Sequence, residues 1–256
     1  MAAARHLSLP RLAGLAFAAT AFAAAPAMFA YLAFFLGNLW PHAPPLAEPS
    51  VDAGATFPPP WAALNDAALL ALFALQHSLM ARSGFKAWQS RFVPRGLERG
   101  CYVMTSNVAL ALLLAFWRPV PITLYELEDG VLEDLVWSVF ILGWMLLLAG
   151  LVAIGPLDLL GLNQARAWFH GRPYAEPPLK SSGLFARLRH PLYAALLICL
   201  WATPHMTAGH ALFAAAFSLY IAVGMRLEER GLLRRFGKAY DDYRARTPAL
   251  LPRLFR

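Results

Sequence analysis

Apolar residues gather in long runs along the chain, and short segments rich in Pro, Gly and charged residues separate these runs. About 20 apolar residues in helical form cross the hydrocarbon core of a bilayer, and several of the runs approach or exceed that length. The fifth run is short, and Pro204 and Gly209 bracket a turn before the sixth, so we expect the last two to form a tight helical hairpin. The predicted spans cover residues 12–39, 63–81, 100–117, 135–155, 191–204 and 207–225.

The composition supports a chain whose main solvent is lipid. Of its 256 residues, 59% are hydrophobic and 14% are charged, whereas soluble proteins average roughly 45–50% and 25%. In a soluble protein the net charge of +7 would suggest a nucleic-acid partner, but here the placement of the charges matters more. We therefore predict an all-α, polytopic integral membrane bundle that forms one domain over residues 1–256, with the lipid bilayer and no nucleic acid as a partner.

The charged segments predict the orientation of this bundle, because short cytoplasmic loops carry an excess of Lys and Arg. Basic residues are concentrated after the second run, after the fourth run and in the tail over residues 226–256, whereas acidic residues dominate the two other connecting segments. Six spans with both termini in the cytoplasm agree with the charge of every connecting segment, and five or seven spans do not. We expect this bundle in a bacterial inner membrane.

The N-terminus resembles a cleavable secretory signal, since Arg5 and Arg11 precede an alanine-rich apolar run. That run continues over residues 12–39, far beyond the roughly 7–15 residues of a signal's apolar region. A retained first membrane span is the better interpretation.

The tail after the sixth run combines apolar and basic residues near helical spacing. This pattern predicts an amphipathic helix at the cytoplasmic interface, and an anchor held by anionic lipid explains it equally well. Pro248 and Pro252 should end the helix. The apolar members are Leu232, Leu233, Phe236, Tyr240 and Tyr243, and the basic members are Arg234, Arg235, Lys238 and Arg244.

Polar side chains at membrane depth are costly and are therefore functional candidates. The predicted orientation places several of them in one cytoplasmic layer, where they can share a site. His205 and His210 belong to the opposite layer, where a wet interfacial role is expected. The residues of the cytoplasmic layer are His77, Tyr102, Arg189, His190, Tyr193, Glu228 and Glu229.

Each of these candidates also has a structural interpretation. Arg189 at a helix start can extend into the headgroups, with Tyr193 as an interfacial aromatic residue. Glu228 and Glu229 can pair with the arginines around them. His77 can be a buried histidine bonded to Ser78, Asn107 or a backbone carbonyl.

Two classes of site are unlikely from the sequence. Cys101 and Cys199 lie in or beside apolar runs without a CxxC pattern, which argues against a disulfide framework and a cysteine zinc site. A soluble Rossmann-type dinucleotide-binding fold is excluded because the chain has no G-x-G-x-x-G loop.

The candidates of the cytoplasmic layer form a recognisable combination of motifs. It resembles the signature of the superfamily of isoprenylcysteine carboxyl methyltransferases and phospholipid methyltransferases. Two departures affect details of the pocket: Gly183-Leu184-Phe185 stands where relatives often have Gly-Pro-Tyr, and Ala194-Ala195 replaces a usual glycine. The motifs are Arg189-His190-Pro191-Leu192-Tyr193, Glu228-Glu229, Phe236-Gly237-x-x-Tyr240-x-x-Tyr243 and Pro248.

Within this superfamily, further strings resemble the methanethiol S-methyltransferases. The similarity covers nearly the whole chain after about residue 60. The strings are Gln76-His77-Ser78, Glu98-Arg99-x-x-Tyr102-Val103, Asp158-Leu159-Leu160-Gly161-Leu162-x-Gln164, Gly171-Arg172-Pro173-Tyr174 and Trp201-Ala202-Thr203-Pro204.

The resemblance implies S-adenosylmethionine as the cofactor and methanethiol, a small thiol, as the substrate, with dimethyl sulfide as the product. Arg189 would hold the carboxylate of the cofactor by a bidentate pair, and the two glutamates would take its ammonium or its ribose hydroxyls. The expected cofactor-binding residues are Arg189, His190, Tyr193, Glu228, Glu229 and Gln164.

Methyl transfer to sulfur needs a thiolate, because the thiol itself is a poor nucleophile. A histidine suits this proton transfer, so we expect His77 as the catalytic base, with Tyr102 at similar depth to orient it or to pass the proton through water. Tyr193 is the rival for the tyrosine role. Alternative acceptors are a lipid amine, a prenylcysteine-like carboxylate or another small thiol, and a non-enzymatic member of the nitrite and nitric oxide reductase-associated U family is a further alternative.

Overall fold

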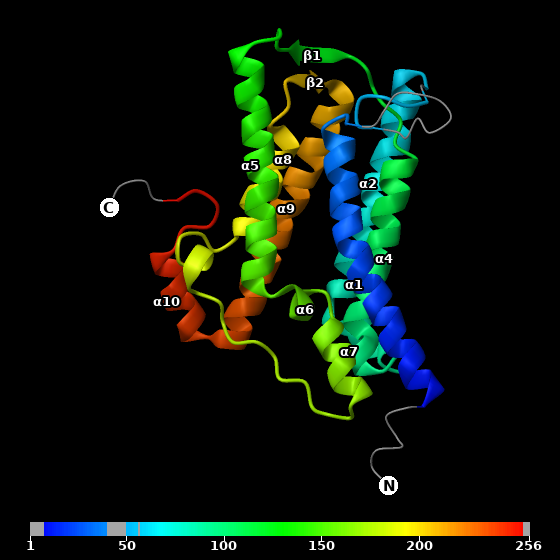
Figure 1. Ribbon diagram of the computed structural model, residues 1–256, viewed down its shortest axis with the longest axis vertical. Helices are drawn as coiled ribbons and strands as arrows, with labels where there is room; N and C mark the ends of the chain where they lie inside the picture. Colours follow the sequence, from blue (N-terminus) through cyan, green and yellow to red (C-terminus); the bar gives the residue numbers. More distant parts are fainter. Residues whose placement is uncertain (1–7, 40–49, 56, 253–256) are drawn as a thin grey trace.

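The computed structural model describes residues 8–39, 50–55 and 57–252. Its long helices run side by side along the longest axis of the molecule (Figure 1). In chain order, the elements are α1 (Leu9–Leu36), α2 (Pro59–Ala81), α3 (Ser83–Gln89), α4 (Arg95–Ala115), β1 (Thr123–Glu126), α5 (Val131–Ile154), α6 (Pro156–Leu159), α7 (Leu162–Phe169), a 3-10 helix (Gly183–Ala186), α8 (Pro191–Trp201), β2 (His205–Thr207), α9 (Ala208–Phe236) and α10 (Lys238–Arg246).

Four helices among the described residues, α1, α2, α5 and α9, are long and apolar enough to cross a membrane. The protein is therefore a mostly helical, multi-pass membrane protein, as the apolar runs predicted. α4 has 21 residues, but Arg95, Glu98 and Arg99 make its first turns polar. α8 has only 11 residues, which is about 16 Å of helix and roughly half the thickness of a hydrocarbon core.

The helices form two groups that share an apolar core. α4 packs against α1 and α2, while α5 packs against α8, and α9 contacts both α8 and α2. Figure 1 shows the first group on the right and the second on the left. The ring centroid of Phe35 lies 6.2 Å from that of Trp117 and 5.5 Å from that of Phe213, and the centroids of Trp117 and Phe213 are 5.2 Å apart. These three rings come from both groups. This aromatic contact joins the two halves of the bundle.

α5 and α8 approach closely because two glycines of α5 leave no side chain between them. A Cβ atom added at Gly143 would lie 2.9 Å from Cys199 Sγ, and one added at Gly150 would lie 3.0 Å from Leu192. Any larger residue at either position would push α8 away from α5. The short helix α8 is thus held by close packing, which also fixes the residues at its start.

The structure adds a two-stranded antiparallel sheet that the all-α prediction lacked. β1 pairs with β2, and Glu126 lies opposite His205. β1 contains residues that favour strands, but four residues are too few for an alternating pattern to stand out from a loop. Since β2 connects α8 to α9, a strand replaces the tight turn that we expected between these helices.

The sixth predicted span and the tail also differ from the prediction. α9 continues without interruption past residue 225 to Phe236, because Arg and Glu are good helix formers and a change to polar residues does not end a helix. The helix stops at Gly237, whose φ of +55° favours glycine. The predicted single amphipathic helix is therefore divided between the last turns of α9 and the separate helix α10.

A buried polar cluster lies at the end of the bundle that carries β1 and β2, which we call the sheet end. Asp52 accepts hydrogen bonds from Asn38 Nδ2 at 2.7 Å and from the hydroxyl of Thr207. Its Oδ2 lies 3.6 Å from Nδ1 of His210. His210 Nε2 in turn lies 3.0 Å from the carbonyl oxygen of Leu200. The cluster ties the loop after α1 to both ends of the β2 connection.

Electrostatics favour a charged Asp52 in this cluster. Burial alone would raise the pKa of its carboxyl group, but hydrogen bonds with His210, Thr207 and Asn38 outweigh burial and hold the pKa below its usual value of 3.8. His210 is only 1% exposed, so the expectation of a wet interfacial role is wrong for this residue. It is buried because the loop over residues 50–55 folds back over the start of α9.

Candidate functional site

A cavity of about 600 Å³ lies at the opposite end of the bundle, which we call the cavity end. Here α2 and α5 end, α4 begins, and the last turns of α9 meet α10 (Figure 1). Sites for small molecules commonly have volumes of about 300–1,000 Å³. The polar and aromatic side chains in its lining are Lys86, Arg95, Glu98, Arg99, Tyr102, Asp158, Gln164, Tyr174, Glu176, Lys180, Phe185, Arg189, Glu228, Arg235, Phe236, Tyr240 and Tyr243.

The residues around the start of α8 form a network with the last turns of α9. Arg189 donates through Nε and Nη2 to Glu229 Oε1 at 2.9 Å and 2.7 Å, and His190 Nε2 lies 3.0 Å from the same oxygen. Tyr193 donates its hydroxyl to Glu228 Oε2 at 2.7 Å. The rings of His190 and Tyr193 are stacked with centroids 5.4 Å apart. The structure thus brings together five of the predicted site residues from two helices.

The alternative pairing of the two glutamates with neighbouring arginines of α9 is not seen. Among the residues that the structure describes, neither glutamate forms an ion pair with Arg226, Arg230, Arg234 or Arg235. Arg235 instead contacts Glu176 at 2.7 Å.

The end of the chain also secures the start of α8. The backbone N–H groups of Arg189 and His190 donate to the carbonyl oxygens of Pro248 and Ala249 at 2.9 Å and 3.1 Å. Arg189 Nη1 donates to the carbonyl oxygen of Thr247. These bonds satisfy donors that would otherwise be unpaired at the beginning of a helix. The segment after α10 therefore holds the start of α8 in position.

His77 of α2 and Tyr102 of α4 are in direct contact. His77 Nε2 lies 2.5 Å from the Tyr102 hydroxyl, and Nδ1 lies 3.0 Å from Ser106 Oγ. Phe73 stacks on the imidazole with ring centroids 5.4 Å apart. If Nδ1 carries the proton and donates it to Ser106, the lone pair of Nε2 faces the tyrosine proton. The arrangement can move a proton from the tyrosine to the histidine.

The other partners expected for His77 lie elsewhere. Ser78 is bonded to Tyr220 at 3.2 Å, and Asn107 donates to the carbonyl oxygen of Ala21. Tyr193, the rival for the tyrosine role, is bonded to Glu228. Of the two candidates, Tyr102 and Tyr193, Tyr102 is therefore the one that is hydrogen-bonded to His77.

Around the turn between α6 and α7, the predicted Gln164 lies with Asp158 and Tyr174, which were not among the predicted site residues. Asp158 Oδ1 accepts hydrogen bonds from Asn163 Nδ2 at 2.9 Å and from the Tyr174 hydroxyl at 3.0 Å. Gln164 Nε2 donates to the backbone carbonyl of Asp158 at 3.0 Å. Gln164 Oε1 is buried and has no hydrogen-bond partner in the described part of the chain. Asp158 and Tyr174 stand in the same motif strings as the predicted residues, and that signal could have identified them.

Arg99 was also missed, although it stands in the string that contains Tyr102. Its Nε donates to the carbonyl oxygen of Leu159 at 2.7 Å, and its guanidinium carbon lies 5.1 Å from the centre of the Tyr102 ring. The turn can approach α4 this closely because Gly161 has no side chain: a Cβ atom there would lie 2.9 Å from Arg99 Cβ. Arg99 therefore links the α6–α7 turn to the His77 and Tyr102 pair.

The predicted residues form two sets, those that line the cavity and those that contact the lining residues. Tyr102, Gln164, Arg189 and Glu228 line the cavity. The other four contact lining residues: His77 contacts Tyr102, Glu229 contacts Arg189, and both His190 and Tyr193 contact Glu228. Their roles in catalysis and in cofactor binding stay predictions.

Two tyrosines in the lining remain protonated at neutral pH and can donate hydrogen bonds. Burial, together with the hydrogen bond to Asp158, raises the pKa of Tyr174 to about 12. Burial and the nearby carboxylate of Glu229 raise the pKa of Tyr240 to about 12.

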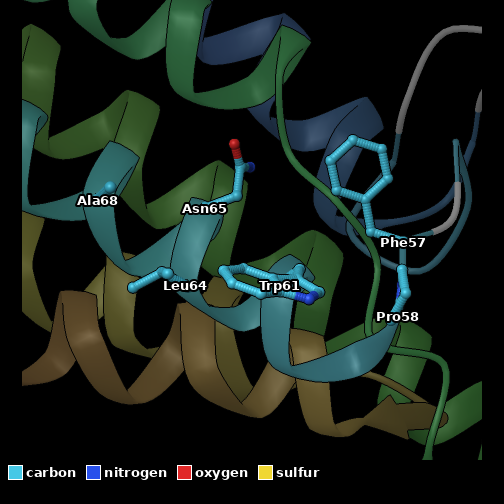
Figure 2. Close-up of a pocket in the computed structure, with 6 residues that line it drawn as sticks. All are labelled: Phe57, Pro58, Trp61, Leu64, Asn65 and Ala68. Atoms are coloured by element: carbon cyan, nitrogen blue, oxygen red, sulfur yellow. The ribbon is translucent and has the colours of Figure 1, made fainter.

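A second hollow, of about 550 Å³, lies beside the first turns of α2 at the sheet end (Figure 2). Figure 2 shows Trp61, Leu64, Asn65 and Ala68 along α2, and Phe57 and Pro58 just before the helix. The Asn65 amide already donates to Asp66 and to the carbonyl oxygen of Phe116. None of the described residues that line this hollow is charged, and an exposed tryptophan here is typical of a membrane interface.

Comparisons with known proteins agree with the motifs. A family model described as NnrU protein matches residues 67–251. Methanethiol S-methyltransferase 2 of Bradyrhizobium diazoefficiens is 40% identical over 96% of this chain and 92% of its own length. Methanethiol S-methyltransferases of Crocosphaera subtropica and Mycobacterium tuberculosis are 36% and 38% identical over 87% and 88% of this chain, and over 85% and 89% of their own lengths. No solved structure matches the chain.

The range matched by the family model includes the network at the start of α8, the His77 and Tyr102 pair and the α6–α7 turn. The resemblance inferred from the motifs is confirmed. This chain belongs to the NnrU protein family, in the group that contains the methanethiol S-methyltransferases.

Proposed function

We propose that this protein is an S-adenosylmethionine-dependent S-methyltransferase that converts methanethiol to dimethyl sulfide. The observation that carries the proposal is the similarity to methanethiol S-methyltransferases, at 36% identity or more over at least 87% of the chain. Two features of the structure support it: a cavity with charged and apolar walls, and a histidine and tyrosine pair at its edge.

We further propose that the chain forms one domain of six spans in a bacterial inner membrane, with its cavity end in the cytoplasm. The concentration of basic side chains at that end and of acidic side chains near β1 supports this orientation. α4 then provides the third span, and the short α8 pairs with α9 in a hairpin. Cytoplasmic cofactor reaches the cavity without crossing the membrane.

The lining fits S-adenosylmethionine, which carries a carboxylate, an ammonium group, ribose hydroxyls and a sulfonium cation. The cavity offers cationic and anionic side chains beside apolar residues such as Ile154 and Phe236. Gln164 Oε1 is buried and accepts no hydrogen bond from the residues described, and a ligand with a donor group would satisfy it. Glu228, Arg189 and Gln164 are in place to touch the ligand, and Glu229, His190 and Tyr193 orient them.

The chemistry requires a thiolate held in line with the methyl group. When bound, S-adenosylmethionine supplies a methyl carbon on a sulfonium, which a thiolate attacks while the electrons of the broken bond return to the sulfonium sulfur. The Tyr102 hydroxyl gives its proton to His77 Nε2 and takes the proton of the thiol, so the histidine ends as the imidazolium. Phe73 and Ser106 hold the imidazole in the orientation that accepts this proton.

The test is an assay of the purified protein in lipid nanodiscs with methyl-labelled S-adenosylmethionine and methanethiol. We expect labelled dimethyl sulfide in the headspace, and none when methanethiol is omitted. Parallel reactions contain a phosphatidylethanolamine lipid, a prenylcysteine analogue or ethanethiol in place of methanethiol.

Each outcome discriminates between functions. Label transferred preferentially to a lipid or to a prenylcysteine carboxylate would reject methanethiol as the acceptor while keeping the enzyme class. A folded protein without turnover, whose thermal stability does not rise in excess S-adenosylmethionine, would support a non-enzymatic role, because a true ligand stabilises the folded state by mass action.

A further inference from the structure

We propose that Arg99, Asp158 and Gln164 form the subsite that binds the amino-acid end of S-adenosylmethionine. The three side chains lie around the α6–α7 turn and all line the cavity. We call them the zwitterion subsite. The inference rests on the proposed function and assigns the orientation of the cofactor within that site.

Arg99 supplies the cation of this subsite. Its Nε is fixed on the carbonyl oxygen of Leu159, whereas Nη1 and Nη2 donate no hydrogen bond to any residue that the structure describes. The guanidinium is held from one side and open on the other, so it presents two parallel donors to the cavity. Two parallel N–H groups match the oxygens of one carboxylate.

Asp158 and Gln164 supply the acceptors. Asp158 Oδ1 already accepts two hydrogen bonds, but Oδ2 accepts none from the described part of the chain. Gln164 donates its amide N–H to the backbone of Asp158, so its unpartnered Oε1 projects from the same turn. An ammonium group has three donors and no acceptor, which suits a carboxylate oxygen next to an amide oxygen.

Arg189, the cation that the resemblance implies for the carboxylate, has most of its donors engaged within the protein. Nε and Nη2 donate to Glu229, and Nη1 donates to the carbonyl oxygens of Arg244 and Thr247. To bind a carboxylate bidentately, Arg189 would have to give up the ion pair with Glu229 and leave that half-buried carboxylate without its partner. Arg99 needs no such rearrangement.

The subsite is also well placed for the methyl transfer. The guanidinium of Arg99 lies 5.1 Å from the centre of the Tyr102 ring, and Tyr102 contacts His77. A short aliphatic chain joins the carboxylate and ammonium of the cofactor to its sulfonium. A ligand held at its amino-acid end by Arg99 and Asp158 therefore has its sulfonium close to the proposed proton acceptor. Glu228 of α9 and Tyr240 of α10, which line the same cavity, are then left for the adenosine end.

The test compares two ligands that share the adenosine group but differ at the other end. S-adenosylhomocysteine retains the amino acid, whereas 5′-methylthioadenosine has only a methyl group there. Binding of both to the protein in nanodiscs is measured by isothermal titration calorimetry for the wild type and for Arg99→Gln and Asp158→Asn. We expect each substitution to weaken S-adenosylhomocysteine by about tenfold or more, the loss typical of a charge-assisted hydrogen bond. The affinity for 5′-methylthioadenosine should not change.

Matched variants control for charge and for folding. Arg91→Gln removes one positive charge from an exposed position that does not line the cavity, and both ligands should bind as in the wild type. Arg99→Lys keeps a cation but loses the planar pair of donors, so its loss should lie between those of the wild type and Arg99→Gln. Unchanged binding of 5′-methylthioadenosine reports that each variant is folded.

The outcomes separate this inference from the proposed function. Equal weakening of both ligands would place Arg99 and Asp158 in the adenosine subsite or in the framework, and would overturn the inference. Unchanged affinity for both ligands would overturn it as well. If the wild type binds neither ligand, the proposed function fails and the inference fails with it.

Discussion

Two polar clusters lie at opposite ends of the same bundle, and they differ in whether their residues line the cavity. At the sheet end, Asp52 receives hydrogen bonds from Asn38 and Thr207 and lies 3.6 Å from His210. At the cavity end, Gln164 Oε1 has no partner among the residues that the structure describes, and its side chain lines a cavity of about 600 Å³.

The difference indicates where each cluster acts. Polar groups that face one another inside the protein stabilise the fold, whereas an open polar atom at the wall of a cavity can be paired by a ligand. Both clusters contain histidines and carboxylates, so residue types alone do not separate them. The sheet end should thus govern stability, and the cavity end should govern binding and turnover.

The strongest test of this contrast is a division of roles within the cavity end. We expect His77→Ala to lower kcat by about 10²–10⁴-fold, the range typical of removing a general base, with an unchanged Kd for S-adenosylhomocysteine. Glu228→Gln should instead raise that Kd by about tenfold, because a charged acceptor is lost. Turnover is measured as labelled dimethyl sulfide and affinity by calorimetry.

His205→Ala provides the control, since this histidine lies in β2 at the sheet end. It should retain both kcat and Kd. If His77→Ala and Glu228→Gln lose affinity to the same extent, the proposed separation of catalytic and binding residues is wrong.

At the sheet end we expect an effect on stability alone. Asp52→Asn removes the charge from a carboxylate with several partners and should lower the free energy of unfolding by about 1–3 kcal/mol. Thermal unfolding in detergent measures this change, and the Kd for S-adenosylhomocysteine should stay the same. The exposed Asp129→Asn serves as the control, and its Tm should match that of the wild type.

The same carboxylate predicts how stability depends on pH. Because the pKa of Asp52 is lower in the folded protein than its usual value of 3.8, its contribution is present above pH 3.8 and is lost as the pH falls through the folded value. The difference in Tm between the wild type and Asp52→Asn should therefore shrink on acidification below about pH 4. A difference that grows in acid would contradict this assignment.

The smallest effect is expected at Tyr174, whose hydroxyl donates a hydrogen bond to Asp158. Tyr174→Phe removes the 3.0 Å hydrogen bond to Oδ1 and should weaken S-adenosylhomocysteine by about two- to tenfold, as expected for one neutral donor. Since burial and Asp158 raise the pKa of Tyr174 to about 12, the effect should be constant between pH 6 and pH 9, a range well below that value.

Tyr125→Phe is the matched control for this prediction. Its hydroxyl donates to the carbonyl oxygen of Thr203 at the sheet end, so the substitution also removes one hydrogen bond but should leave the affinity unchanged. Equal losses in both variants would mean that Tyr174 acts through general stability.

Much of the fold could be predicted because membrane helices follow from local composition. The long apolar runs identified α1, α2, α5 and α9, and Pro191 marked the start of α8. The β1–β2 pairing was missed because each strand is very short and its partner lies some 80 residues away in the chain. The extension of α9 to Phe236 was missed because polarity was used to end a helix, whereas Gly237 ends it.

The candidate site was likewise predicted only in part from the sequence. Placing polar residues in one layer brought His77 near Tyr102 and Arg189 near Glu229, and the structure has both contacts. Arg99 did not stand out, because an arginine at the start of a helix is also what the membrane interface favours. Its bond to Leu159, 60 positions further along the chain, fixes its guanidinium at the cavity, and no local pattern encodes that contact.

By itself, the sequence determined that the protein lies in a membrane, which segments are helical and which polar residues share a layer, because hydrophobicity and helix propensity act over neighbouring residues. The tertiary structure decided which polar groups are paired and which remain open, because partners such as Asp52 and Thr207 are 155 positions apart and meet only in the folded chain. Hydrogen bonds depend on distances of about 3 Å that no local pattern encodes. The distinction between a stabilising cluster and a binding site therefore appears only in the folded protein.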